Sequence, residues 1–160
     1  MTESENHFLT RIGPGTPMGN LMRQYWIPVF QSSDLPQKDG SPLRVRLLCE
    51  NLVAFRDTQG RIGLMDHTCP HRCASLFYGR NEENGLRCLY HGWKFDVHGR
   101  CVDVPNELQG SKFQEKIRVT AYPCIEKNGI VWTYMGPDRD NPPPLPELGW
   151  AMVEPKRRGT

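Results

Sequence analysis

Short apolar segments separated by turn residues dominate the chain between residues 42 and 136. The first segment, residues 43–48, alternates apolar and polar positions with a period of two, which is typical of a strand with one buried face. Residues 52–56 follow after Cys49-Glu50-Asn51, and we expect the two segments to pair. Further strands are predicted at residues 62–65, 93–95, 117–122 and 130–135. Asn128-Gly129 is a strong hairpin signal between the last two. The pattern therefore predicts an all-β core.

The two ends of the chain follow other patterns. A short helix is predicted where Thr16 can cap and Pro17 occupies the first position, continuing to residue 25. Pro28 and Pro36 then divide the chain into extended pieces. Residues 137–146 are rich in proline, which cannot donate to a sheet and favours extended backbone. We therefore divide the chain into a lead segment (1–41), a β domain (42–136) and a Pro-rich linker (137–160).

Composition narrows the class of protein. The 20 Lys and Arg residues nearly balance the 18 Asp and Glu residues, and a net charge of +2 gives no basis for nucleic-acid binding. The 15 Gly and 14 Pro residues imply many turns and argue against a bundle of long helices. No apolar run approaches the roughly 20 residues that span a bilayer, and the N-terminus has no signal-peptide pattern. We expect a cytoplasmic protein without a membrane anchor.

Two short motifs bring together cysteine and histidine. Cys69-Pro70-His71 and Cys88-Leu89-Tyr90-His91 each supply one thiolate and one imidazole, and sixteen residues separate the two motifs. In a reducing compartment such residues are metal ligands more often than disulfide partners. A single Zn²⁺ could use this Cys₂His₂ set. A two-iron cluster fits better, with both thiolates on one iron and both imidazoles on the other, which is the ligation of a Rieske [2Fe-2S] centre.

The surrounding residues resemble a known family. The segments at 69–72, 74–76 and 87–96 are similar to the Rieske domain of aromatic ring-hydroxylating oxygenases. Residues 13–20, with 23–26 and Pro28, resemble more narrowly the phthalate dioxygenase type of oxygenase subunit. The resemblance implies a Rieske-type antiparallel β sandwich with a small cluster-binding subdomain, in which Cys69, His71, Cys88 and His91 hold the cluster.

The same resemblance implies the partners and the reaction. In that family, electrons pass from a reductase of the flavin or ferredoxin type, through the Rieske cluster, to a mononuclear non-haem Fe(II) in a catalytic domain. That iron activates O₂ to hydroxylate or O-demethylate an aromatic acid, and the full-length protein is expected to form a trimer. The resemblance implies that the catalytic domain, with its facial triad of two His and one carboxylate, lies outside this chain. His7, His67 and His98 are expected in turns or on the surface, so we expect electron transfer without oxygenase turnover.

Five further residues are expected around the cluster: Arg72, Cys73, Tyr90, Gly92 and Trp93. Tyr90 and Trp93 are expected to pack over the ligand loops, and Gly92 to allow the backbone close to the cluster. Cys73 stands where the family usually has Gly. We expect it to be a small, partly buried side chain, the alternatives being an extra ligand or a redox partner.

Two other functions stay open from the sequence. The first is a stand-alone Rieske-type ferredoxin, which the long lead segment and the Pro-rich end argue against. The second is a structural zinc-binding interaction module, which colour would distinguish, because an iron-sulfur cluster absorbs visible light and a zinc site does not.

Overall fold

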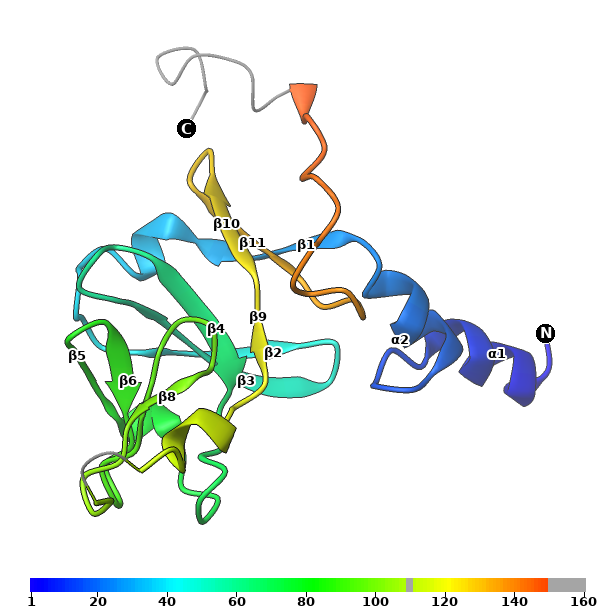
Figure 1. Ribbon diagram of the computed structural model, residues 1–160. Coiled ribbons are helices and arrows are strands. Elements are labelled where there is room, and N and C mark those ends of the chain that lie inside the picture. Colours follow the sequence, from blue (N-terminus) through cyan, green and yellow to red (C-terminus); the bar gives the residue numbers. More distant parts are fainter. Residues whose placement is uncertain (109–110, 150–160) are drawn as a thin grey trace.

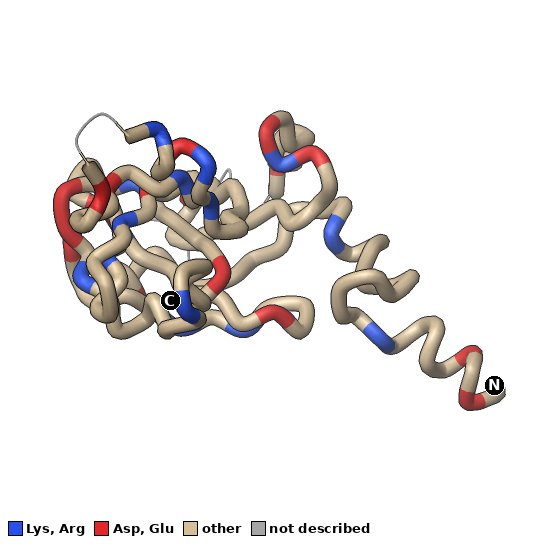
Figure 2. The backbone as a smooth tube through the Cα atoms, turned by 60° about the horizontal axis from the view of Figure 1, so that its bottom comes forward, with Lys and Arg blue, Asp and Glu red and all other residues tan. Residues whose placement is uncertain are grey.

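Three antiparallel sheets form the body of the protein, as seen in the computed structural model, which describes residues 1–108 and 111–149 (Figure 1). Their strand orders are β2-β3-β4-β9, β1-β11-β10 and β5-β6-β7-β8. The predicted all-β core is confirmed. Acidic and basic residues are interspersed along the described backbone in Figure 2.

The central sheet contains β2 (Leu43–Leu47), β3 (Glu50–Arg56), β4 (Ile62–Asp66) and β9 (Ala121–Tyr122). The expected pairing of the first two segments is confirmed, with Leu43 opposite Ala54 and Leu47 opposite Glu50. Leu48 and Cys49 form the turn between them, both with positive φ (46° and 66°), so β2 ends one residue earlier than expected.

A second sheet contains β1 (Trp26–Gln31), β11 (Ile130–Tyr134) and β10 (Cys124–Lys127). β1 is an edge strand, which explains how it accommodates Pro28, and its register shifts between Pro28 and Phe30. The hairpin signal at Asn128-Gly129 is confirmed, because both residues have positive φ (59° and 80°) between β10 and β11. The lead segment is thus attached to the β domain by a strand pairing.

The third sheet is made of very short strands: β5 (Arg80–Glu82), β6 (Gly85–Arg87), β7 (Lys94–Phe95) and β8 (Cys101–Asp103). Short 3-10 turns flank the sheets: η1 (Ser32–Asp34), η2 (Leu76–Tyr78) and η3 (Gln114–Lys116). The strand expected at 117–122 is wrong in length, since only its last two residues form β9 and Arg118 makes an isolated bridge to Arg100.

β3 and β4 are buried on both faces because they lie between two hydrophobic cores. Val53, Phe55 and Met65 pack against the third sheet, in one core with Leu86 and Phe95. The alternate residues Leu52, Ala54 and Leu64 pack toward the second sheet, in another core with Tyr122 and Met135. The period-two pattern of these strands therefore builds two cores, one on each face.

The helices are short and lie at the N-terminal end. α2 (Pro17–Met22) begins where expected, with Thr16 Oγ1 accepting a hydrogen bond from the Gly19 N–H at 3.2 Å. It ends at Met22, three residues before the expected end. α1 (Glu3–Thr10) was not predicted, although Thr2 and Glu5 form a capping box at its start. α1 has no buried residue and extends away from the sheets (Figures 1 and 2).

The segment after β11 runs without further strands as far as residue 149. Trp26, at the start of β1, donates its indole N–H to the carbonyl of Pro143 at 2.7 Å. Residues 150–160 of the expected linker lie outside the described residues. Among the helices of the described part of the chain, none has the length and apolar character needed to cross a membrane.

Candidate metal centre

Two loops at one end of the molecule carry the four expected ligands, at the bottom of Figure 1. The first ligand loop (residues 67–75) follows β4 and contains Cys69 and His71. The second ligand loop (residues 88–93) connects β6 to β7 and contains Cys88 and His91. Both therefore lie at the ends of strands that belong to one core, which includes Cys69 and Cys88.

The two loops share one hydrogen-bonding pattern. In the first, the Cys69 N–H donates to the Ala74 carbonyl at 2.8 Å, and the Cys73 N–H donates to the Cys69 carbonyl at 2.9 Å. In the second, the Cys88 N–H donates to Trp93 at 2.8 Å, and the Gly92 N–H donates to Cys88 at 3.0 Å. Each cysteine thus closes a turn with the residues four and five positions later.

The fourth residue after each cysteine has positive φ, at 56° for Cys73 and 77° for Gly92. Glycine is favoured in this conformation, and Cys73 adopts it with a side chain present. The expectation that Cys73 is partly buried is wrong, because its side chain is exposed. At Gly92, an added Cβ would lie 2.9 Å from Cγ of Pro105, so the close approach recorded there is to a neighbouring loop.

The two thiols form a buried pair. Cys69 is 2% exposed, Cys88 is 3% exposed, and neither is in a disulfide. Burial, helped by the neighbouring Cys88 thiol, raises the pKa of the Cys69 thiol to about 11. Without a metal, Cys69 therefore stays protonated at neutral pH, and a metal ion must displace that proton to bind.

The two imidazoles form a second pair, nearer the surface. The ring centroids of His71 and His91 are 4.5 Å apart, at 63°. Trp93 stacks on His71, with centroids 4.4 Å apart and planes at 7°. Tyr90, which is 60% exposed, lies against His91 at 3.9 Å. Trp93 and Tyr90 thus each contact one imidazole.

Nδ1 of His71 is buried and has no hydrogen-bond partner among the described residues. A buried polar atom without a partner costs free energy unless something else satisfies it. Burial lowers the pKa of His71, and the charges of His91 and Arg72 lower it further. The ring is therefore neutral at neutral pH, which is the state that binds a metal.

The donor set fits two metal ions held by unlike pairs. Among the described residues, no three His, Cys, Asp or Glu side chains are grouped around a single point as one metal ion requires. The donors are two buried sulfurs and two adjoining imidazoles, with an unpartnered nitrogen on one imidazole. This arrangement suits a [2Fe-2S] cluster with Cys₂ on one iron and His₂ on the other.

The remaining residues considered in the sequence analysis are Arg72 and the three histidines that are not candidate ligands. Arg72 is exposed beside His71. His7 lies on α1 and His98 is exposed in the turn before β8. Nδ1 of His67 lies 3.2 Å from the carbonyl oxygen of Asn51. These three histidines are on separate elements and do not form a common site.

Three residues near the loops had no role in the sequence analysis. Pro105 lies next to Gly92, Phe113 meets the Trp93 ring edge-on at 6.0 Å, and Arg87 donates to the Gly92 carbonyl of the second ligand loop. Pro105 and Phe113 lie in irregular backbone for which no sequence pattern predicts a contact. Arg87 had one signal, its place directly before Cys88.

Comparison with known proteins identifies relatives over most of the chain. The family model described as "Rieske [2Fe-2S] domain" matches residues 25–124. The oxygenase subunit of 3-chlorobenzoate-3,4-dioxygenase from Comamonas testosteroni is 54% identical over 144 residues, which are 90% of this chain and 33% of that protein. The oxygenase subunit of phthalate 4,5-dioxygenase from Pseudomonas putida is 49% identical over 154 residues, or 96% of this chain and 35% of that protein.

Solved structures agree with this result. The crystal structure of dicamba monooxygenase bound to dicamba matches with a TM-score of 0.69 at 27% identity, covering 82% of this chain and 40% of that one. In the sequence comparisons described above, the chain spans about a third of the length of the two curated relatives.

Proposed function

Since the chain belongs to the Rieske [2Fe-2S] domain family, we propose that it transfers single electrons through one [2Fe-2S] cluster held by four ligands: Cys69, His71, Cys88 and His91. The cluster, when bound, accepts and releases one electron at a time. The observation that carries the proposal is the arrangement of the ligands as a buried thiol pair and a more exposed imidazole pair on matching loops.

The site has a buried side, formed by the thiols, and a more exposed side, formed by the imidazoles. The thiols are at most 3% exposed, so solvent is excluded from their side of the site. Both imidazoles are half-buried, and Leu89 (67% exposed) and Tyr90 (60% exposed) belong to the same ligand loop as His91. An electron partner can therefore approach the histidine side of the site, and the stacked Trp93 keeps His71 in its orientation.

We further propose that the chain acts as the electron-transfer module of an oxygenase subunit. In this proposal a reductase supplies the electrons, and a mononuclear non-haem iron in a catalytic domain receives them. The names of the two curated relatives point to an aromatic acid as the substrate of the whole enzyme. A trimeric full-length protein and a cytoplasmic location belong to the same proposal.

The proposed division of the chain follows the same logic. Residues 42–136 form the cluster-binding domain, the lead segment (1–41) is attached to it through β1, and residues 137–160 form the linker. The hydrogen bond from Trp26 to Pro143 joins the lead segment, at the start of β1, to the linker.

An anaerobic titration with dithionite tests the proposed function. The chain, loaded with iron and sulfide, should take up about one electron and lose part of its visible absorption. The reduced chain should then be reoxidised by O₂ in the presence of phthalate without forming a hydroxylated product. Chain loaded with Zn²⁺ is the control and should take up no electrons. Failure of the iron-loaded chain to take up an electron, or hydroxylation of phthalate by this chain alone, would contradict the proposal.

A further inference from the structure

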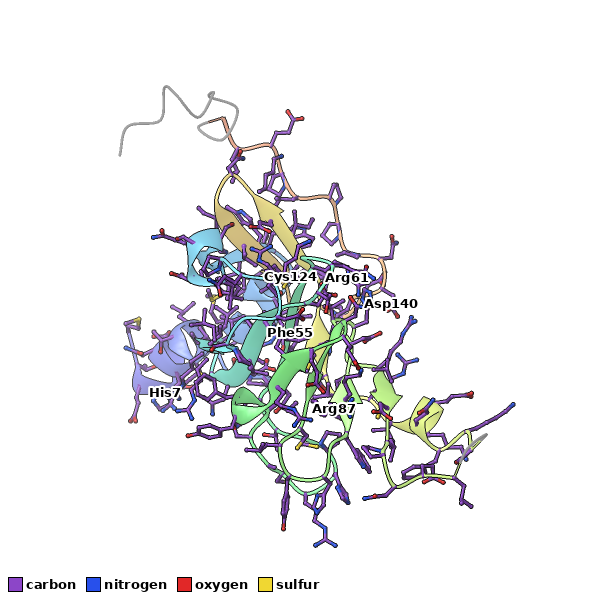
Figure 3. The ribbon with its side chains drawn as sticks, turned by 90° about the vertical axis from the view of Figure 1, so that its left-hand side faces the viewer. His7, Phe55, Arg61, Arg87, Cys124 and Asp140 are labelled. Atoms are coloured by element: carbon purple, nitrogen blue, oxygen red, sulfur yellow. The ribbon has the colours of Figure 1, made fainter. Side chains whose placement is uncertain are left out.

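Arg87, the last residue of β6, has three partners beside the second ligand loop. Its Nη1 donates to the Gly92 carbonyl at 2.8 Å and to Oδ2 of Asp103 at 2.7 Å. Its Nε donates to Oε1 of Glu82 at 2.5 Å. The guanidinium thus joins β5, β6 and β8 to the loop, and Figure 3 shows Arg87 on the strands just above the loop region.

The contact with Gly92 reaches both imidazoles. Gly92 directly follows His91, and its carbonyl belongs to the peptide that leads into Trp93. Holding this carbonyl fixes the plane of the Gly92–Trp93 peptide, and Trp93 stacks on His71. One hydrogen bond from Arg87 therefore constrains the backbone beside His91 and the ring that covers His71.

The guanidinium is itself held firmly. The Arg87 side chain is only 13% exposed, and carboxylates from two different strands bind it. The hydrogen bond from Arg87 also holds the pKa of the Glu82 carboxyl below its usual range. A planar guanidinium can serve three partners in fixed directions, whereas a lysine ammonium at the same place is a single point charge on a flexible stem.

We propose that Arg87 is a positioning residue for the cluster, holding the second ligand loop, and through it His91 and Trp93, in the geometry that retains iron. This inference rests on the proposed function. It adds a residue that contacts no ligand side chain and acts through the Gly92 carbonyl.

The test compares two arginine-to-lysine variants of the 160-residue chain, both loaded with iron and sulfide. Arg87→Lys keeps the charge and removes the forked contacts. Arg56→Lys is the matched control, because Arg56 is similarly buried (12% exposed), binds Glu126 through two nitrogens and donates to the Leu35 and Gly60 carbonyls. Arg56 lies on β3, and its side chain contacts Leu35, Gly60 and Glu126, none of which belongs to a ligand loop. The readouts are the rate of iron loss to EDTA and the EPR spectrum of the reduced cluster.

Arg87→Lys should lose iron about 10 to 100 times faster than the unmodified chain and should shift the EPR signal. Arg56→Lys should lower the thermal unfolding midpoint and leave iron loss and the EPR signal unchanged. Iron loss and an EPR signal in Arg87→Lys that match the unmodified chain would overturn the inference and leave Arg87 a purely structural residue.

If Arg87→Lys does not fold, the variants Glu82→Gln and Asp103→Asn decide the matter, since each removes one anchor of Arg87 and keeps its bond to Gly92. Each should speed iron loss by a smaller factor and shift the EPR signal in the same direction. Unchanged values in both would overturn the inference. An unmodified chain that binds no iron and sulfide would overturn the proposed function, and this inference with it.

Discussion

At the scale of single residues, the candidate ligands differ in burial in a way that matches their chemistry. The thiols of Cys69 and Cys88 both lie in the core, and burial raises the pKa of the Cys69 thiol, so that a metal ion is needed to hold its thiolate at neutral pH. His71 is less buried, and its lowered pKa keeps the ring ready to bind. The exposed Cys73 lies only two residues from His71, which makes it a natural test of which thiols are ligands.

Replacing one buried and one exposed cysteine should show which of the two is a cluster ligand. Cys88→Ser removes a thiolate from the proposed cluster, so we expect the visible absorption and most of the bound iron to be lost. Cys73→Ser is the matched control and should keep both, because its side chain points to solvent. The measurement is the absorption spectrum with iron and sulfide analysis; loss of the cluster in Cys73→Ser and its retention in Cys88→Ser would reverse the assignment.

The candidate ligand residues could be proposed from the sequence because each pair lies within a few positions of one loop. Cys-x-His and Cys-x-x-His are local patterns, which can be recognised in a sequence without knowledge of the fold. The role of Arg87 could not be predicted, because Glu82 and Asp103 reach it only after β5, β6, β7 and β8 have paired. The positive φ of Cys73 could not be predicted from the residue itself, since glycine is the residue that normally occupies such a turn.

At the scale of elements, tight turns determine where strands and loops begin. Gly99, in the turn between β7 and β8, has φ of 73°, and a Cβ added there would lie 2.2 Å from the Val119 carbonyl oxygen. Gly129, between β10 and β11, has φ of 80° and no atom within 4 Å of an added Cβ. The two glycines therefore share a conformation and differ in the space around them.

Alanine substitution at each glycine should distinguish the cost of the left-handed backbone from the cost of close packing. Gly129→Ala should lower the free energy of unfolding by about 1 kcal/mol, which is the cost of left-handed backbone for a residue with a Cβ. Gly99→Ala should add a clash with Val119 and cost about 1–3 kcal/mol more. Urea unfolding followed by circular dichroism measures both. Equal losses in the two variants would show that the close packing around Gly99 has no energetic consequence.

Most of the strands that the sequence predicted have four or more patterned residues, and 93–95, which contains β7, is the exception. β3, β4 and β11 were expected because apolar residues repeat along them, and the β10–β11 turn because Asn128-Gly129 favours it. β5, β6 and β8 have three residues each, too few for a periodic signal. The expected strand at 117–122 is mostly irregular, because only Ala121 and Tyr122 pair with β4.

At the scale of the whole molecule, long-range polar contacts join the sheets that the two cores bring together. Arg56 on β3 binds Glu126 on β10 through two hydrogen bonds of 2.8 and 2.9 Å. Arg23, after α2, binds Glu50 at the start of β3 at 2.7 Å and donates to the Leu48 carbonyl at 3.0 Å. These contacts connect the lead segment and the second sheet to the central sheet, which carries the first ligand loop.

The ion pair between Arg56 and Glu126 should make stability depend on pH. The hydrogen bond from Arg56 holds the pKa of Glu126 below its ordinary value of 4.5. A depressed carboxyl pKa stabilises the folded state above the unfolded-state pKa, and this stabilisation is lost as pH falls through the folded-state pKa. The difference in unfolding free energy between the unmodified chain and Glu126→Gln should therefore be constant from pH 7 to about 5 and shrink below that. Urea unfolding at several pH values measures it, and a difference that grows in acid would contradict the ion pair.

The central claim is that one [2Fe-2S] cluster is held by Cys69 and Cys88 on one iron and by His71 and His91 on the other. Pulsed EPR of the reduced chain, labelled with ¹⁵N-histidine, tests it most directly, because only nitrogen bound to the cluster couples strongly to the unpaired electron. We expect two ¹⁵N couplings, together with about two irons and two sulfides per chain. A cluster without histidine couplings, or one zinc per chain without sulfide, would contradict the account.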